Sequence, residues 1–341
     1  MSATLQHPAA AHRAGFKARV LPSMRDIPLT AWRRMLPDEP EGWEYYTAVE
    51  NCPPSADFTL GAVAVYSDSE VVAAAPMFHA TYRLDTPLQN GLRKITDKIF
   101  EFAPQLLTLR VIGLGSPISD NLTIALQPSL NASDRILAVA AMLNALEQEA
   151  ARTKAAIIAV KSIDLLADEM DPAVAGRGYT RITSVPTTML ELPYRNMDEF
   201  FAALAPKPRA DLRRKYRTRS KVHFETRSSI RGLEEEIYDL FQNTLANSRV
   251  DYGEFEQVHP DYFRAVLDAL GGKARLRLAW HEGRLMSFSL ALVGGDCIVT
   301  KQIGLLYPEA RHLNLYFLNW LDLIEFALER RIPAIDMGST S

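Results

Sequence analysis

Apolar residues alternate with polar ones, or run together, over two neighbouring stretches in the first half of the chain, residues 58–66 and 71–82. The residues between them, Ser67-Asp68-Ser69, are typical of a tight turn. Because a β-strand points successive side chains to opposite faces, such stretches are expected to be strands with a buried face. The pattern therefore predicts a β-hairpin.

The second half repeats this pattern and adds a third strand. Residues 275–280 and 285–293 flank His281-Glu282-Gly283, and Gly294-Gly295-Asp296 then leads into 297–305. Glycine, aspartate and their neighbours at these places favour tight turns between strands. We therefore expect three consecutive strands here.

A long amphipathic helix and a short apolar strand are expected next in each half. The first helix, 133–153, is capped by Asn131 or Ser133, and its apolar side holds Ile136, Ala140, Leu143, Leu146 and Ala150. The second helix, 314–331, is stopped by Pro333 and places on one polar stripe Asn319, Asp322, Glu325 and Glu329. Residues 156–160 and 334–337 are the expected strands.

The order of hairpin, further strand, crossover helix and parallel strand thus occurs twice, which predicts an α/β fold with mixed sheets in two tandem units related by duplication. We expect a flexible N-terminal tail over 1–19, a first unit over 20–194 and a second over 195–341. A right-handed crossover points the start of its helix toward the carboxyl ends of the strands, where a phosphate-bearing ligand would be held.

Composition narrows the class of protein. The chain has 341 residues, 48% of them hydrophobic, and a net charge of -3, which is too balanced for a surface built wholly to hold nucleic acid. Cys52 and Cys297 are too few and too far apart for a disulfide framework or a cysteine zinc site, so we expect a reduced, cytoplasmic protein without a metal. No stretch is apolar enough to span a membrane, since even 313–328 contains charged residues.

One segment departs from this balance. Residues 207–231 hold ten basic side chains against two carboxylates, a local charge of +8, and 207–221 is expected to be a basic helix. Such a helix can meet phosphate on tRNA, on an acyl carrier or on a lipid head group. It can equally be a solvated helix that bridges the units and pairs with nearby glutamates, and both interpretations stay open.

Several of these segments together resemble a known family. The chain is similar to the GNAT acyltransferase superfamily, and more narrowly to its tandem-domain, Fem-like branch, most clearly over 195–341. The residues that carry the resemblance are Phe200-Phe201-Ala202-Ala203-Leu204, Arg209-Ala210-Asp211-Leu212-Arg213-Arg214-Lys215 and Ala334-Ile335-Asp336-Met337-Gly338. The resemblance implies transfer of an acyl group from a thioester, or of an aminoacyl group from tRNA, to an amine.

Two features depart from the family pattern. Residues 307–312 contain no glycine before the second helix, where simpler acetyltransferases have a glycine-rich phosphate loop. The chain also stops at Ser341, soon after the Asp-x-Gly strand, whereas members of this branch usually continue with further strands. We therefore expect the second unit to be either shortened or completed differently.

The implied reaction needs an oxyanion donor and a cradle for the donor's phosphates. The strand 297–305 is the candidate for the oxyanion donor, and Lys301 and Gln302 on it are substrate-binding candidates, one of which would face the cleft. The candidates for binding acyl-CoA lie at the start of the second helix and on the basic helix: Arg311, His312, Asn314, Arg213, Arg214 and Arg217. Exposed loop residues are the alternative for Arg311 and His312.

The reaction also needs a group that takes a proton from the amine. The loop 249–259 is rich in suitable side chains, and from it we select Asp251 and Glu254 as catalytic candidates and Tyr252 and His259 as substrate-binding candidates. A polar surface loop is the alternative. Asp336, at the end of a buried strand, is the third catalytic candidate, with a turn cap as its alternative.

These observations predict an N-acyltransferase that uses acyl-CoA and modifies the amine of a small or amino-acid-like acceptor. The enzymatic alternative is an aminoacyl-tRNA-dependent Fem-like transferase, with tRNA or another phosphate-bearing carrier bound by the basic helix. The alternative from another class is a catalytically silent GNAT fold that binds a partner. A monomer and a homodimer are both compatible with the sequence.

Overall fold

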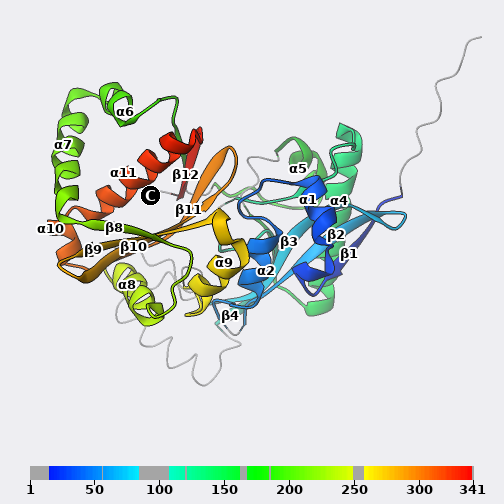
Figure 1. The fold of residues 1–341 in the computed structure, drawn as a ribbon. Helices are drawn as coiled ribbons and strands as arrows, with labels where there is room; N and C mark the ends of the chain where they lie inside the picture. The colour runs from blue at the N-terminus through cyan, green and yellow to red at the C-terminus, as the bar shows by residue number, and fades with distance from the viewer. Residues whose placement is uncertain are drawn as a thin grey trace, which may run out of the picture.

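The structure is a computed structural model that describes residues 15–55, 57–83, 107–119, 121–161, 167–183, 186–248 and 257–339. Figure 1 shows two α/β halves side by side, each a twisted sheet with helices against it. The first half carries the elements from blue to the green of α5, and the second half those from the light green of α6 and α7 to red. The expected fold class is therefore confirmed.

The first half contains a six-stranded sheet in its described part, with the order β1-β2-β3-β4-β6 and β5 paired to β3. All of its neighbours are antiparallel except β4 and β6, which are parallel. The strands are β1 (Lys17–Leu21), β2 (Thr59–Ser67), β3 (Glu70–Arg83), β4 (Thr108–Leu114), β5 (Ala125–Leu126) and β6 (Ile157–Val160). The helices are η1 (Met24–Asp26), α1 (Leu29–Met35), α2 (Trp43–Glu50), α4 (Ala132–Thr153) and α5 (Ala167–Val174).

The second half has a sheet with the order β7-β12-β11-β10-β9-β8, in which only β11 and β12 are parallel. Its strands are β7 (Thr187–Glu191), β8 (His223–Arg227), β9 (Ala274–His281), β10 (Arg284–Val293), β11 (Cys297–Leu305) and β12 (Ala334–Ser339). Its helices are α6 (Met197–Ala203), α7 (Pro206–Tyr216), η4 (Arg217–Lys221), α8 (Glu234–Ala246), α9 (Tyr262–Leu270), η6 (Gly271–Lys273), α10 (Glu309–His312) and α11 (Leu315–Arg330).

The strand orders show the duplication directly. β1-β2-β3-β4-β6 corresponds to β8-β9-β10-β11-β12, with α4 and α11 as the matching crossover helices. The same glycine–phenylalanine pair occurs at matching positions, since Gly113 lies opposite Phe78 and Gly304 lies opposite Phe288. A β-carbon on either glycine would lie 2.2 Å from the phenylalanine ring, so each ring packs onto a bare backbone.

The two crossover helices form for the reasons that the sequence indicates, but they bury different groups. Asn131 caps α4, because its side chain accepts a hydrogen bond from the Asp134 N–H at 2.9 Å. The expected polar stripe on α11 is wrong in part, since Asn319 and Asp322 are buried. Asp322 is buried because three arginines from outside the helix bond to it.

Three element boundaries differ from expectation. The basic helix is α-helical only to Tyr216 and continues as the 3₁₀ helix η4 to Lys221. β1 begins at Lys17, inside the segment expected to be tail, and it pairs with β2. β7, expected in the first unit, pairs with β12 at the edge of the second sheet. The division at residue 195 itself stays a prediction.

The halves pack against each other through α2 and α9, which lie next to each other between the two sheets (Figure 1). Tyr45 of α2 and Tyr262 of α9 are both fully buried, and their hydroxyls are 3.2 Å apart. One apolar core extends from Phe58 and Phe78 of the first half to Phe263 and Phe288 of the second. The first half therefore covers the face of the second sheet against which α9 packs.

Within the described ranges, no helix is long and apolar enough to cross a bilayer, and no three side chains of the metal-ligating types gather at one place. Both cysteines are free thiols.

Candidate active site

The parallel strands β11 and β12 part after three residues. Their pairing runs from Cys297 opposite Ala334 to Val299 opposite Asp336, whereas β11 itself continues to Leu305. In the first half the equivalent strands stay paired to their ends, with Gly113 opposite Ala159. The counterpart of Gly113, Gly304, has no partner on β12. The duplicated fold is therefore open at this place in the second half and closed in the first.

A β-bulge lies where the strands part. Opposite Ser289 to Ala291 of β10, β11 runs from Ile303 to Thr300, so β11 has one extra residue at Lys301–Gln302. The bulge interrupts the alternation of faces that was expected for these two residues. The Oε1 atom of Gln302 is buried and has no hydrogen-bond donor among the described residues. Backbone and side-chain groups of β11 are thus turned out of the ladder at the opening.

The far end of β11 is held from the side of α8. The Leu305 N–H donates to Thr244 Oγ1 at 2.7 Å, and the Tyr307 N–H donates to Asn243 Oδ1 at 2.8 Å. These two bonds satisfy backbone donors beyond the bulge and fix the direction of the strand. The segment of β11 without a β12 partner is therefore attached to α8 at its far end.

Lys301 reaches the first half. Its ammonium bonds to the Glu41 carboxylate and, at 2.7 Å, to the Ile118 carbonyl, and it lies 5.0 Å from the centre of the Tyr45 ring. The side chains of Lys301 and Glu41 are each only 4% exposed. Because a buried charge without a partner is costly, this pair fixes the bulge against the first half.

Asp336 lies on the other side of the opening and is 2% exposed. Its Oδ2 accepts a hydrogen bond from Asn121 Nδ2 at 3.0 Å, and its Oδ1 accepts from the Gly338 N–H at 2.9 Å. The second bond is the turn cap considered in the sequence, and the first comes from the other half of the molecule. The first half thus contacts both edges of the opening, through Ile118 and Asn121.

Two carboxylates that the sequence analysis did not select lie at the same junction. Glu41 pairs with Lys301, and Glu39 has its pKa raised by burial and, further, by the negative charges of Glu41 and Asp336. In the sequence these residues are part of a short, proline-containing polar loop with no motif. Lys301, the partner of Glu41, lies 260 residues away, and Asp336, which acts on Glu39, is similarly distant, so no local signal could have identified them.

α11 follows the short helix α10, which ends in Arg311 and His312. Arg311 and His312 are exposed, and the Arg311 guanidinium lies 5.0 Å from the centre of the Tyr307 ring. Asn314, the N-cap, adopts a left-handed conformation with φ of 55° and makes no side-chain capping bond. Unlike α4, α11 therefore begins with backbone N–H groups that no cap side chain satisfies.

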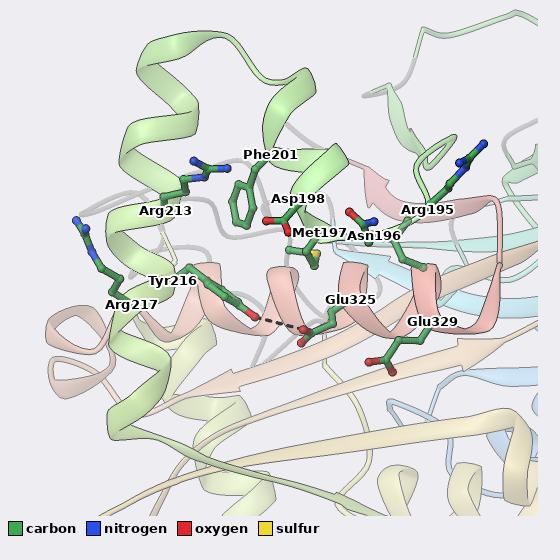
Figure 2. Close-up of a pocket in the computed structure, with 11 residues that line it drawn as sticks. Arg195, Asn196, Met197, Asp198, Phe201, Arg213, Tyr216, Arg217, Glu325 and Glu329 are labelled. Carbon is green, nitrogen blue, oxygen red and sulfur yellow. Dashed lines mark hydrogen bonds between the residues drawn. The ribbon is translucent and has the colours of Figure 1, made fainter.

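The basic helix crosses α11, and a pocket of about 600 Å³ lies between α6, α7 and α11 (Figure 2). Arg213 lies beside the Phe201 ring, 5.5 Å from its centre, while Arg217 and Arg195 lie at opposite ends of the pocket. Within the described part of the chain, none of these three arginines pairs with a carboxylate. Arg214 instead pairs with Asp211 on its own helix at 2.7 Å.

The rest of the basic segment is anchored to α11. The Tyr216 hydroxyl donates to Glu325 at 3.3 Å, as Figure 2 shows, and Arg219 pairs with Asp322 and Glu325. Asp322 also receives Arg275 at 2.6 Å and Arg277 at 2.8 Å. Burial alone would raise the pKa of Asp322, but the bonds from Arg277 and Arg275 outweigh it and lower that pKa. Part of the segment thus has the structural role considered for it.

The acidic loop before α9 is mostly outside the described residues, and this includes Asp251, Tyr252 and Glu254. His259 is described, and its Nδ1 accepts a hydrogen bond from the Asp261 N–H at 3.1 Å just before α9. Of the selected residues, the structure brings Lys301, Gln302 and Asp336 to one opening. It places Arg213 and Arg217 on a different surface, at the α7 pocket.

The family comparison matches this half of the molecule. Residues 207–340 match the family model described as an acetyltransferase (GNAT) domain. Seven curated UPF0262 proteins from Brucella species are 34% identical to this chain over 87 residues, which is 25% of this chain and 53% of each relative. The chain therefore spans about half the length of the curated relatives it matches.

Solved structures share the fold across both halves. FemX superposes with a TM-score of 0.52 and 14% identity, covering 87% of this chain and 82% of FemX. A conserved protein of unknown function from Bacteroides thetaiotaomicron gives 0.52 and 10%, covering 93% and 88%. The C-terminal domain of a putative lysylphosphatidylglycerol synthetase from Agrobacterium fabrum gives 0.50 and 12%, covering 90% and 76%.

Two of the three segments that first indicated the family, the basic segment and the Asp-x-Gly strand, fall inside the matched region, whereas residues 200–204 precede it. The duplicated sheets extend the likeness in fold to the first half. Residues 207–340 thus match the acetyltransferase (GNAT) domain family, and the tandem fold of the whole chain is similar to that of FemX.

Proposed function

We propose that this chain is an N-acyltransferase that moves an acyl group from acyl-CoA to the amine of a small or amino-acid-like acceptor. The observation that supports this most is the parting of β11 and β12 after Val299 and Asp336, together with the pairing of the equivalent strands at Gly113. A thioester placed in such an opening lies beside strand backbone that the ladder does not use. With its two free thiols, the chain suits a reducing cytoplasm.

The β11 segment from Thr300 to Gly304 would supply the backbone N–H that stabilises the oxyanion. Gln302, with its unpaired Oε1, would contact the substrate, and Lys301 would hold the bulge in place through Glu41. Asp336 would help to hold the acceptor at the other edge. We retain Asp251 and Glu254 as further proton acceptors, and Tyr252 and His259 as further substrate contacts.

For the donor's phosphates we propose Arg311, His312 and Asn314 at the start of α11. Two exposed side chains and a helix start without a side-chain cap form a surface that favours anions. This arrangement would replace the glycine-rich loop that residues 307–312 lack. A phosphate there would need no metal ion.

Isothermal titration with acetyl-CoA and octanoyl-CoA tests this proposal. We expect saturable heat for at least one donor, and Arg311→Ala is expected to weaken that binding by about tenfold or more, because it removes a charged hydrogen bond to phosphate. Arg34→Ala, an exposed arginine of the first half, is the matched control. No heat from either donor at millimolar concentration would overturn the choice of acyl-CoA.

A second candidate donor is aminoacyl-tRNA. It is favoured by Arg195, Arg213 and Arg217, which line the α7 pocket without carboxylate partners in the described part of the chain, and by the FemX-like fold. Arg213→Ala combined with Arg217→Ala should then abolish tRNA binding, and the affinity of the unaltered protein should fall steeply with salt. If CoA and tRNA both fail to produce transfer while a partner still binds, the catalytically silent alternative is favoured.

A further inference from the structure

A second, smaller pocket lies between the two halves, on the side of the sheet away from α11. Its volume is about 220 Å³, and it lies between the loop after α1 and the end of α9 with η6. The loop is firmly seated there, since a β-carbon on Gly294 would lie 2.7 Å from Pro40 Cγ and 3.2 Å from the Asp38 carbonyl. The pocket is lined by Arg33, Glu39, Pro40, Glu44, Ala269, Leu270, Gly272 and Lys273.

Among the described residues, Glu39 is the carboxylate of this pocket that pairs with no cation. Glu44 pairs with Arg33, and Glu41 pairs with Lys301, whereas the bond given to Glu39 Oε1 comes from the Glu41 N–H at 3.3 Å. The charged and titratable groups that face Glu39 come from six elements or loops: Glu41, Arg33, Glu44, Lys273, Cys297 and Asp336.

Glu39 and the neighbouring Glu41 bring this pocket close to the strands that part. Glu41, two residues after Glu39, bonds to Lys301 at the bulge, and the charge of Glu39 acts on Asp336 and Cys297 of the parted strands. Burial and the neighbouring negative charges of Glu41 and Asp336 raise the pKa of Glu39, which makes it a stronger base than an exposed carboxylate.

We propose that this pocket binds the amine of the acceptor, a primary amine carried as its ammonium, and that Glu39 accepts the proton from it. The inference rests on the proposed acyl transfer and adds to it the acceptor class and a residue from the first half. A volume of about 220 Å³ holds the end of an amine-bearing side chain.

The chemistry balances with no further reactant. The ammonium gives one proton to the Glu39 carboxylate, and the neutral amine then attacks the thioester carbonyl carbon. The C–N bond forms and the C–S bond breaks, with the bonding electrons leaving on sulfur. The second amine proton goes to that thiolate, so that the products are an amide, free CoA thiol and a protonated Glu39 that returns its proton to water.

The first test removes the proton acceptor. Thiol release from acetyl-CoA or octanoyl-CoA is followed with a panel of ethanolamine, lysine and spermidine over a range of pH. Glu39→Gln keeps the shape of the side chain and should lower kcat/KM at neutral pH by about 100-fold or more. The deficit should shrink as the pH approaches the pKa of the amine, because the acceptor is then already neutral. Asp38→Asn, which removes an exposed charge on the same loop, should keep the wild-type profile.

The second test fills the pocket. Nothing lies within 4 Å of a β-carbon on Gly272, so Gly272→Phe can be accommodated and should raise KM for the amine several-fold while leaving KM for acyl-CoA unchanged. Gly295→Phe is the matched control, because its β-carbon position is equally open and it does not line the pocket.

The outcomes separate the two proposals. No thiol release by the unaltered protein with any donor and amine overturns the proposed acyl transfer itself. An active unaltered protein, with a wild-type pH profile for Glu39→Gln or an unchanged amine KM for Gly272→Phe, overturns the role of the pocket alone. If Glu39→Gln does not fold, Glu39→Asp replaces it. Its carboxylate is one methylene further from the amine but can still accept a proton, so kcat/KM should fall while its dependence on pH is kept.

Discussion

At the scale of single residues, the tightest constraint at the site is the bare backbone of Gly304 on β11. A β-carbon there would meet the Phe288 ring at 2.2 Å and Leu240 Cβ at 2.9 Å, and Phe288 is fully buried. The matching position, Gly113, meets only the Phe78 ring at comparably short range. The second half therefore has less room for relaxation at this position than the first.

We expect Gly304→Ala to lower the free energy of unfolding by about 1–3 kcal/mol, the usual cost of overpacking a core, and Gly113→Ala to lower it by less. Urea unfolding of both variants checks this order, with Gly295→Ala as the unhindered control. Equal effects at the two glycines would show that Leu240 yields freely.

The sequence could predict most residues that shape the strands but few that shape the site. The sequence limits the cap of α4 to Asn131 or Ser133, because a cap acts on its own helix, and the structure shows Asn131. It places Asp322 on a polar stripe, because helical spacing shows which residues share a face and not what covers that face. The covering arginines, Arg275 and Arg277, come from β9, and only the folded chain brings them to α11.

At the scale of elements, the anchor of η4 on α11 decides where the basic segment lies. Arg219 of η4, with Arg275 and Arg277 of β9, converges on the single carboxylate of Asp322, which is 3% exposed. The spacing of charges along 207–221 indicated a basic helix, but not that it would change to a 3₁₀ turn at Arg217, where the chain must reach this anchor. The end of α7 therefore meets α11 where η4, which follows it directly, is fixed to Asp322 and Glu325.

Removing the Asp322 carboxylate should weaken the attachment of α7 and η4 to α11. Asp322→Asn leaves Arg275 and Arg277 without their charge partner and leaves Arg219 with Glu325 alone, and we expect a loss of about 3–5 kcal/mol in the free energy of unfolding, measured in urea. Glu70→Gln, in an exposed pair with Arg34, should change it little. Unchanged stability of Asp322→Asn would contradict the anchor.

Asp322 also determines in which direction the stability of the protein changes with pH. The folded pKa of Asp322 is lower than its value in the unfolded chain, so its stabilising contribution is complete above the unfolded pKa and is lost as the pH falls through the folded one. Acid unfolding followed by circular dichroism should therefore show a smaller loss of stability with falling pH for Asp322→Asn than for the unaltered protein. An identical acid limb for the two would show that Asp322 does not contribute.

At the scale of the whole molecule, the two copies of the fold differ in the pairing of their parallel strands. The first copy keeps its parallel strands paired, and the Lys161 ammonium donates to the Pro117 carbonyl at 3.0 Å, within the turn that carries Ile118 and Asn121. Ile118 and Asn121 of this turn form hydrogen bonds with Lys301 and Asp336 of the second copy. The duplication was readable from the sequence because strands and helices repeat locally. The difference between the two copies could not be predicted from the sequence, because it depends on contacts across the junction of the halves.

The pair of Lys301 and Glu41 should couple the halves energetically. Lys301→Met leaves a buried carboxylate without its cation, and Glu41→Gln leaves a buried ammonium, so each is expected to cost about 3–5 kcal/mol in urea unfolding. The double variant removes both charges and should cost less than the sum of the two, by about 0.5–3 kcal/mol. Strictly additive losses would mean that the contact does not couple the halves. If the second sheet needs the first half to hold its bulge in place, both single variants should also lose acyl transfer under conditions where they remain folded.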